Sequence, residues 1–236
     1  MTSKSLYIDQ AILEEKYKCY GYFYSIVLHD HKFPCRSVLE IVDKTKIPHQ
    51  TDDLLKQIPD LVVIMMNPGA SRPKIDQSIE VQLDSIKDMK ISLTTTIPDR
   101  TQYQIMRIME AKNWTHSRIL NLSDLRDPKS GKFYKYFELV ESILGSDHHT
   151  IFSKLREKEL YKKLNSKSPI LAAWGVSDKL DPLINKCMNN INNENLIGIR
   201  KSGSLYKYYH PLLQGTPFNQ KEWLNKLYII LQNTFS

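Results

Sequence analysis

The chain has 236 residues and a mass of 27.6 kDa, which suits one α/β domain with a sizeable hydrophobic core. Hydrophobic residues make up 41% of it, as in ordinary globular proteins, and the longest aliphatic run, residues 61–66, is far shorter than a bilayer span. These features exclude a membrane-spanning protein. Because the first residues show no secretory signal pattern, we expect a cytoplasmic protein.

The positive charge of the chain is concentrated in its second half. The net charge is +7; residues 1–110 hold 14 basic and 15 acidic side chains, whereas residues 111–236 hold 19 and 11. A basic half in a protein of pI about 9.1 predicts a polyanionic partner, usually nucleic acid. The alternative is a lysine-rich surface without such a partner.

Three widely separated cysteines, Cys19, Cys35 and Cys187, do not suit a disulfide framework or a cluster that needs four thiolates. Cys19 and Cys35 with two histidines, His29 and His31, are an alternative zinc site, but their spacing is not typical of zinc ribbons or fingers. We expect no metal, no cofactor and a monomer.

The regular part of the chain begins at residue 61. Residues 61–66 form a continuous apolar run stopped by Asn-Pro-Gly, which is typical of a strand buried on both faces of a sheet. Further strands are predicted at 118–121, 168–174 and 196–199. Helices are predicted at 103–111, 133–144, 153–165, 180–191 and 219–231, the last with a capping-box start. Before them, 17–28 and 37–42 suggest strands.

Strands that alternate with helices predict an α/β fold. We expect a three-layer αβα sandwich with a central, mainly parallel four-stranded sheet over residues 61–236, and residues 1–60 as an N-terminal elaboration packed on this core. Ligands of such folds bind beyond the carboxyl ends of the strands.

Polar or glycine-containing motifs follow the four predicted strands in this order: Asn67-Pro68-Gly69, Asn121-Leu122-Ser123-Asp124, Trp174-Gly175 and His210-Pro211-Leu212. Each motif is common by itself, as a turn, a cap or a bend. Their order and spacing are more specific, and they predict a functional site at one edge of the sheet.

The ordered set resembles the uracil-DNA glycosylase superfamily over residues 60–230. Ile-Met-Met-Asn-Pro-Gly (64–69) is similar to Gly-Ile-Asn-Pro-Gly of its mismatch-specific branch, and His-Pro-Leu (210–212) to His-Pro-Ser-x-Leu. A closer similarity is to a bacterial domain family of unknown function that reads Asn-Pro-Ser, Ala-Ala-Trp-Gly and Lys-Ser-Gly followed by His-Pro-Leu. Met65 and Leu212 depart from the glycosylase motifs, which usually have glycine and serine there.

The resemblance implies a monofunctional DNA glycosylase, which flips a base, hydrolyses its N-glycosidic bond and leaves an abasic site. This chemistry needs a held water and a donor aimed at the departing base. By the resemblance, Asn67 would position the water, His210 would donate to the base, and Asn121 would read its polar edge. The rest of the implied base pocket is Met66, Pro68, Gly69, Trp174 and Gly175.

Gly69 stands where uracil-specific enzymes have a tyrosine that blocks substituents on the pyrimidine C5. The resemblance therefore implies a modified or mismatched pyrimidine as substrate, in DNA repair, or a hypermodified phage cytosine, in antiviral defence. We expect DNA contacts from Lys201, Ser202, Gly203, Ser204 and Lys207 through phosphates, and from Pro211, Leu212 and Leu213 at the base stack. Alternatively, Leu212 and Leu213 are residues of the hydrophobic core without a DNA contact.

Two other functions are consistent with the sequence. A non-catalytic module on the same fold would bind a nucleic acid or a nucleotide without turnover. A magnesium-dependent nuclease would use Pro98-Asp99 with Glu110-Ala-Lys112, although that motif belongs on a strand and residues 104–112 read as a helix.

Overall fold

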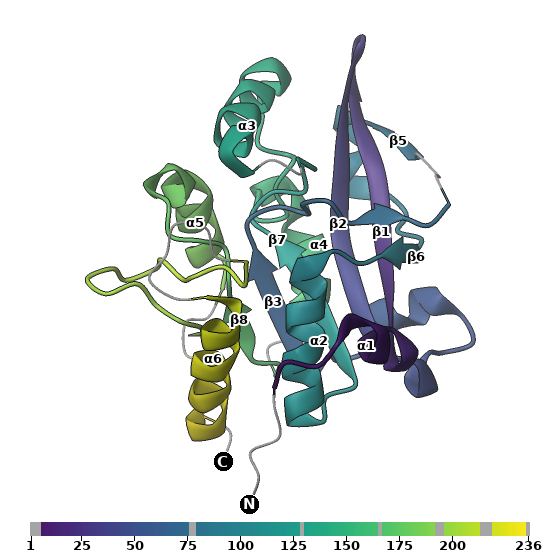
Figure 1. The fold of residues 1–236 in the computed structure, drawn as a ribbon. Coiled ribbons are helices and arrows are strands. Elements are labelled where there is room, and N and C mark those ends of the chain that lie inside the picture. Colours follow the sequence, from purple (N-terminus) through teal and green to yellow (C-terminus); the bar gives the residue numbers. More distant parts are fainter. Residues whose placement is uncertain are drawn as a thin grey trace, which may run out of the picture.

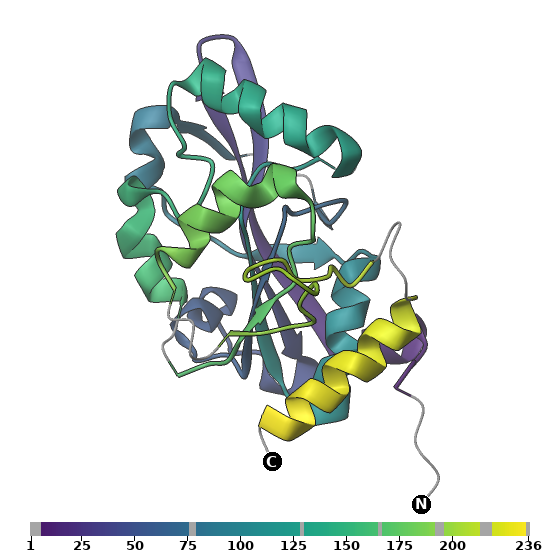
Figure 2. The same ribbon diagram turned by 90° about the vertical axis from the view of Figure 1, so that its left-hand side faces the viewer.

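The computed structural model describes residues 6–75, 79–127, 130–164, 167–191, 196–212 and 219–234, with the backbone alone at 130–132. Within these ranges the strands form one nine-stranded mixed sheet, with helices on both faces (Figure 1, Figure 2). The predicted mixed α/β class is confirmed.

Four parallel strands contain the elements predicted from residue 61 onward. They are β3 (Leu61–Met65), β7 (His116–Asn121), β8 (Ile170–Ala172) and β9 (Leu196–Ile197), which lie in the order β7-β3-β8-β9. In β3, Val62 and Ile64 contribute to the apolar cluster on one face, whereas Leu61 and Val63 contribute to the cluster on the other. Both faces are covered, so the strand has no polar position.

The sheet is larger than the four strands predicted, and its additional part is mainly antiparallel. β1 (Tyr17–Leu28) and β2 (His31–Asp43) form a long hairpin, and β2 pairs with β7. On the far side of β1 lie β4 (Arg72–Pro73), β5 (Ile79–Gln82) and β6 (Thr94–Ile97). The first sixty residues therefore continue the sheet, because β2 takes up the backbone groups that β7 would otherwise leave unpaired at an edge.

Helices cover the two faces of this sheet in two groups. One face carries α1 (Gln10–Lys16), α2 (Arg100–Lys112) and α6 (Gln220–Thr234); the other carries α3 (Ser130–Leu144), α4 (Glu157–Lys163) and α5 (Asp181–Met188). Short 3₁₀ turns occur at Lys44–Lys46, Thr51–Lys56, Leu83–Asp88, Lys154–Arg156 and Asp178–Leu180. In the described ranges, no helix has the length and apolar character needed to cross a membrane.

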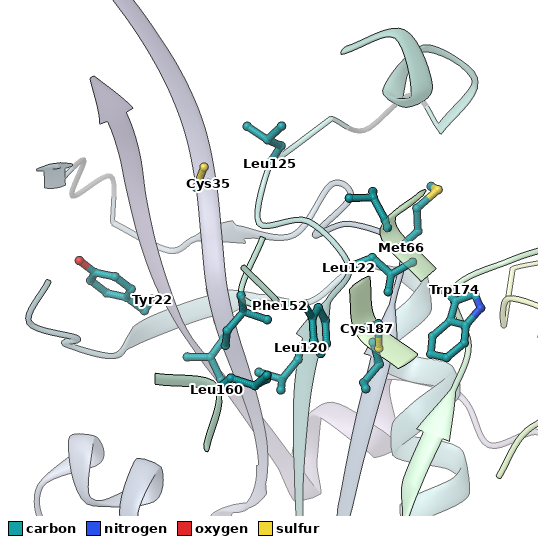
Figure 3. Packing of buried hydrophobic residues seen from close by; sticks show 14 of the residues in the cluster. Tyr22, Cys35, Met66, Leu120, Leu122, Leu125, Phe152, Leu160, Trp174 and Cys187 are labelled. Carbon is teal, nitrogen blue, oxygen red and sulfur yellow. The ribbon is translucent and has the colours of Figure 1, made fainter. Parts of the chain in front are cut away.

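The predicted capping box of α6 is present. Asn219 Oδ1 accepts hydrogen bonds from the backbone N–H groups of Lys221 and Glu222, and the Glu222 side chain accepts one from the Asn219 N–H. On the opposite face of the sheet, the larger apolar cluster extends from Tyr22 on the hairpin to Trp174 after β8 (Figure 3). It supports the loops that follow the parallel strands.

Candidate active site

A cleft of about 700 Å³ opens at the carboxyl ends of β3 and β8. Eight of the predicted site residues line it: Met66, Asn67, Pro68, Gly69, Trp174, Gly175, His210 and Leu212. A larger hollow of about 960 Å³, between residues 6–8, α2 and α6, contains none of them. The smaller cleft therefore brings together residues that are separated by more than a hundred positions in the sequence.

Asn67 is held at the start of the loop after β3. Its Nδ2 donates a hydrogen bond to the backbone carbonyl of Asp127 at 2.9 Å, which leaves Oδ1 as the acceptor of the amide. Two residues later, Gly69 has φ +64°, in the left-handed region that favours glycine. The backbone conformation thus favours glycine at position 69, and the absence of a side chain also leaves that wall of the cleft open.

A buried arginine that the sequence analysis did not single out forms hydrogen bonds with this loop, residues 67–71. Arg36 on β2 is fully buried and donates to Ser71 Oγ at 2.6 Å and to the Pro68 carbonyl at 3.4 Å. Burial lowers the pKa of this guanidinium to about 10. No local sequence signal identifies Arg36, because its partners Pro68 and Ser71 lie 32 and 35 positions further along the chain.

Asn121 does not line the cleft, contrary to the base-reading role that the resemblance implied. It is fully buried at the end of β7. The side-chain amide is oriented so that both its nitrogen and its oxygen have hydrogen-bond partners. Its Nδ2 donates to the backbone carbonyl of Asn67 at 3.1 Å, and its Oδ1 accepts from Arg36 Nη2 at 3.3 Å. In this structure, Asn121 supports the loop that carries Asn67.

His210 is half-buried on the cleft wall, and its tautomer is set by the backbone. Nδ1 accepts a hydrogen bond from the Leu212 N–H at 3.0 Å, and this contact is shorter than the 3.4 Å between Nδ1 and the Leu212 carbonyl. We therefore assign the proton of the neutral ring to Nε2. Burial lowers the pKa of His210 below that of an exposed histidine, against the opposing effects of the Leu212 backbone contact and the charge of Asp99. At neutral pH this ring is therefore a neutral hydrogen-bond donor.

Trp174 joins the cleft to the hairpin of residues 200–208. Its Nε1 donates to the Tyr206 carbonyl at 2.9 Å, and its ring meets Tyr208 edge to face at 5.5 Å. Gly198 permits the Tyr208 ring to pack closely against the backbone, because a Cβ at position 198 would lie 2.6 Å from the Ala172 carbonyl oxygen and 2.7 Å from the Tyr208 ring. Trp174 is thus mainly a core residue with one edge at the cleft.

The residues predicted to contact DNA have different surroundings. Ser202 and Gly203 are exposed at the turn of the hairpin, and Lys201 and Ser204 are half-buried beside them. Lys207 forms ion pairs with Asp178 and Asp181, so its charge is already compensated. Pro211 is buried, Leu212 is half-buried, and Leu213 lies outside the described residues.

The proposed nuclease motif is not assembled. Asp99 caps the start of α2, whereas Glu110 and Lys112 lie in its last turn, about 16 Å away along a helix that rises about 1.5 Å per residue. Glu110 instead pairs with Lys16. Asp99 lines the cleft with Tyr134 and Tyr209, none of which the sequence analysis had assigned to a base pocket.

The alternative zinc ligands are also apart, because Cys19 packs on one face of the sheet and Cys35 on the other. Across the described ranges, no group of three or more histidine, cysteine, aspartate and glutamate residues is arranged to hold a metal ion. Comparisons of the chain with family models, curated proteins and solved structures found no match.

Proposed function

We propose that the protein is a DNA glycosylase that releases a modified or mismatched pyrimidine and leaves an abasic site. The observation that carries the proposal is the meeting of Asn67, Gly69 and His210, from distant parts of the chain, in one cleft at the strand ends. The strand order β7-β3-β8-β9, with helices on both faces, is the part of the fold that we assign to a glycosylase-like core. One chain supplies all these groups.

The chemistry uses two hydrogen-bonding groups of this cleft. Asn67 Oδ1 accepts from a water molecule and orients it toward the sugar, while Nδ2 is anchored on Asp127. His210 Nε2–H donates to the carbonyl of the base, where negative charge develops as the glycosidic bond breaks. A donor that is already in place needs no reorganisation during the reaction.

The DNA lies, in this proposal, along the cleft and the hairpin of residues 200–208. The backbone and hydroxyl groups of residues 201–204 contact phosphates. Leu205 lies on the same hairpin and is 70% exposed. Together with Leu212 it supplies an apolar side chain that inserts between neighbouring bases where the target base is flipped out. The excess of basic residues after position 110 supplies the long-range attraction.

A base-release assay tests the proposal. The protein is incubated in EDTA with DNA that carries uracil, a thymine mismatch, hydroxymethylcytosine or glucosylated hydroxymethylcytosine, and abasic sites are then cleaved with alkali. We expect abasic sites at one of these pyrimidines, and none with the double variant Asn67→Ala/His210→Ala. Binding without base release would instead support a non-catalytic module, and strand cleavage that needs magnesium would support a nuclease.

The open wall at Gly69 predicts the specificity. The Gly69→Tyr variant is expected to lose about 10- to 200-fold in kcat/KM on 5-substituted pyrimidines relative to uracil, because the ring occupies space beside C5. Gly69→Ala is the matched control, since it carries the same backbone strain at φ +64° with little bulk. Equal losses in both variants, on all substrates, would assign Gly69 a purely conformational role.

A further inference from the structure

A carboxylate that belongs to none of the glycosylase-like motifs lies in the same cleft. Asp99 precedes α2 and lines the cleft together with Asn67, Gly69 and His210. Its Oδ2 would lie 3.2 Å from a Cβ placed on Gly69, two residues after Asn67. The carboxylate therefore lies against the loop that carries Asn67, in the same cleft.

Asp99 is also held firmly in place. Its Oδ1 accepts a hydrogen bond from the Thr101 N–H at 2.7 Å, and the Gln102 side chain completes a capping box by accepting from the Asp99 N–H. Arg36 and His210 are both close enough for the negative charge of Asp99 to raise their pKa values against the effect of burial. A carboxylate that is fixed among these groups is suited to proton transfer or to stabilising a cationic sugar.

The amide of Asn67 has no capacity to take a proton from the attacking water. Resting on the function proposed above, we propose that Asp99 is the general base of this cleft, acting beside Asn67 on the same water. Asn67 then orients the water, and Asp99 supplies the basicity that the amide lacks. The cap that Asp99 makes for α2 keeps its carboxylate at the cleft wall.

Base release exchanges the glycosidic bond for a bond between the sugar and water. The water oxygen forms a bond to C1′ of the deoxyribose while the bond between C1′ and the base nitrogen breaks. The electron pair of that bond leaves with the base, whose anion accepts the hydrogen bond from His210. Asp99 takes one proton from the water and passes it through solvent to the base, so the products are a C1′-hydroxyl abasic site and the neutral base.

The Asp99→Asn variant separates catalysis from capping, because asparagine caps a helix as well as aspartate does. We expect the single-turnover rate of base release to fall about 10²- to 10⁴-fold, the range for loss of a general base. The Kd for substrate DNA and the midpoint of thermal unfolding are expected to stay unchanged. Asp88→Asn, at an exposed position, is the control and is expected to retain the wild-type rate.

The outcomes distinguish the two proposals. If the wild-type protein releases a base and Asp99→Asn does so at the same rate, Asp99 is a capping residue only and the assignment of the base is wrong. If the wild-type protein releases no base from any of the substrates, the glycosylase function fails, and the role of Asp99 fails with it. A slow Asp99→Asn variant with unchanged binding and unfolding supports the general base.

Discussion

Replacing His210 with alanine is expected to slow base release by about 10²- to 10³-fold, as for the loss of one preorganised donor to a developing anion. The neutral ring carries its proton on Nε2 because Nδ1 accepts from the Leu212 N–H. Burial keeps the pKa of His210 below its usual value, so the ring that donates from Nε2 is uncharged at neutral pH. The measurement is the single-turnover rate on the preferred substrate.

The control for this prediction is His210→Gln, whose side chain keeps an N–H donor. It is expected to retain more of the rate than His210→Ala, with a similar Kd for DNA in both variants. If alanine and glutamine are equally slow, then hydrogen-bond donation is not the contribution of His210. If neither variant is slower than the wild type, the assignment of His210 to the leaving base is wrong.

The second large effect is on stability, at a buried ion network between the loop after β7 and α4. Arg156 is 1% exposed and bonds to Asp124 at 2.7 Å and to Glu159 at 2.8 Å. Burial alone would raise the pKa of Glu159, but Lys163 and Arg156 hold it well below its usual value. Arg156→Met is expected to lower the free energy of unfolding by about 3–5 kcal/mol, because Asp124 is left buried without its counter-ion.

Urea unfolding at neutral pH measures this loss, with Lys158→Met, at an exposed position two residues after Arg156 in α4, as the matched control. The control is expected to change the free energy of unfolding by no more than about 0.5 kcal/mol. Adding Asp124→Asn to Arg156→Met removes the unpaired charge and is expected to restore part of the stability. A loss no larger than that of Lys158→Met would show that the network is not required for stability.

Several elements were predictable because their signals are local. The apolar run of β3 requires cover on both faces, and the Asn219–Glu222 capping box specifies the start of α6 without reference to any other segment. The order of the polar motifs predicted that Asn67 and His210 would meet at one sheet edge. They do so because parallel strands bring their carboxyl ends together.

The size of the sheet was not predictable in the same way. Residues 17–28 and 37–42 indicate strands, but apart from each other their partners are β5, β6 and β7, which are far away in sequence or very short. Strand pairing depends on backbone groups that every residue shares, so the composition of a strand does not identify its neighbour. The nine-stranded sheet therefore differs from the predicted four-stranded one.

The sequence by itself determined the mixed α/β class, most element positions and eight of the residues that line the cleft. The tertiary structure decided how the surroundings of those residues differ: Asn121 is buried behind Asn67, Lys207 is neutralised by two aspartates, and Asp99 enters the cleft from α2. The physical reason is that burial and pairing depend on segments brought together from across the chain. A motif specifies which groups are present, and the packing around it specifies which of them face the cleft.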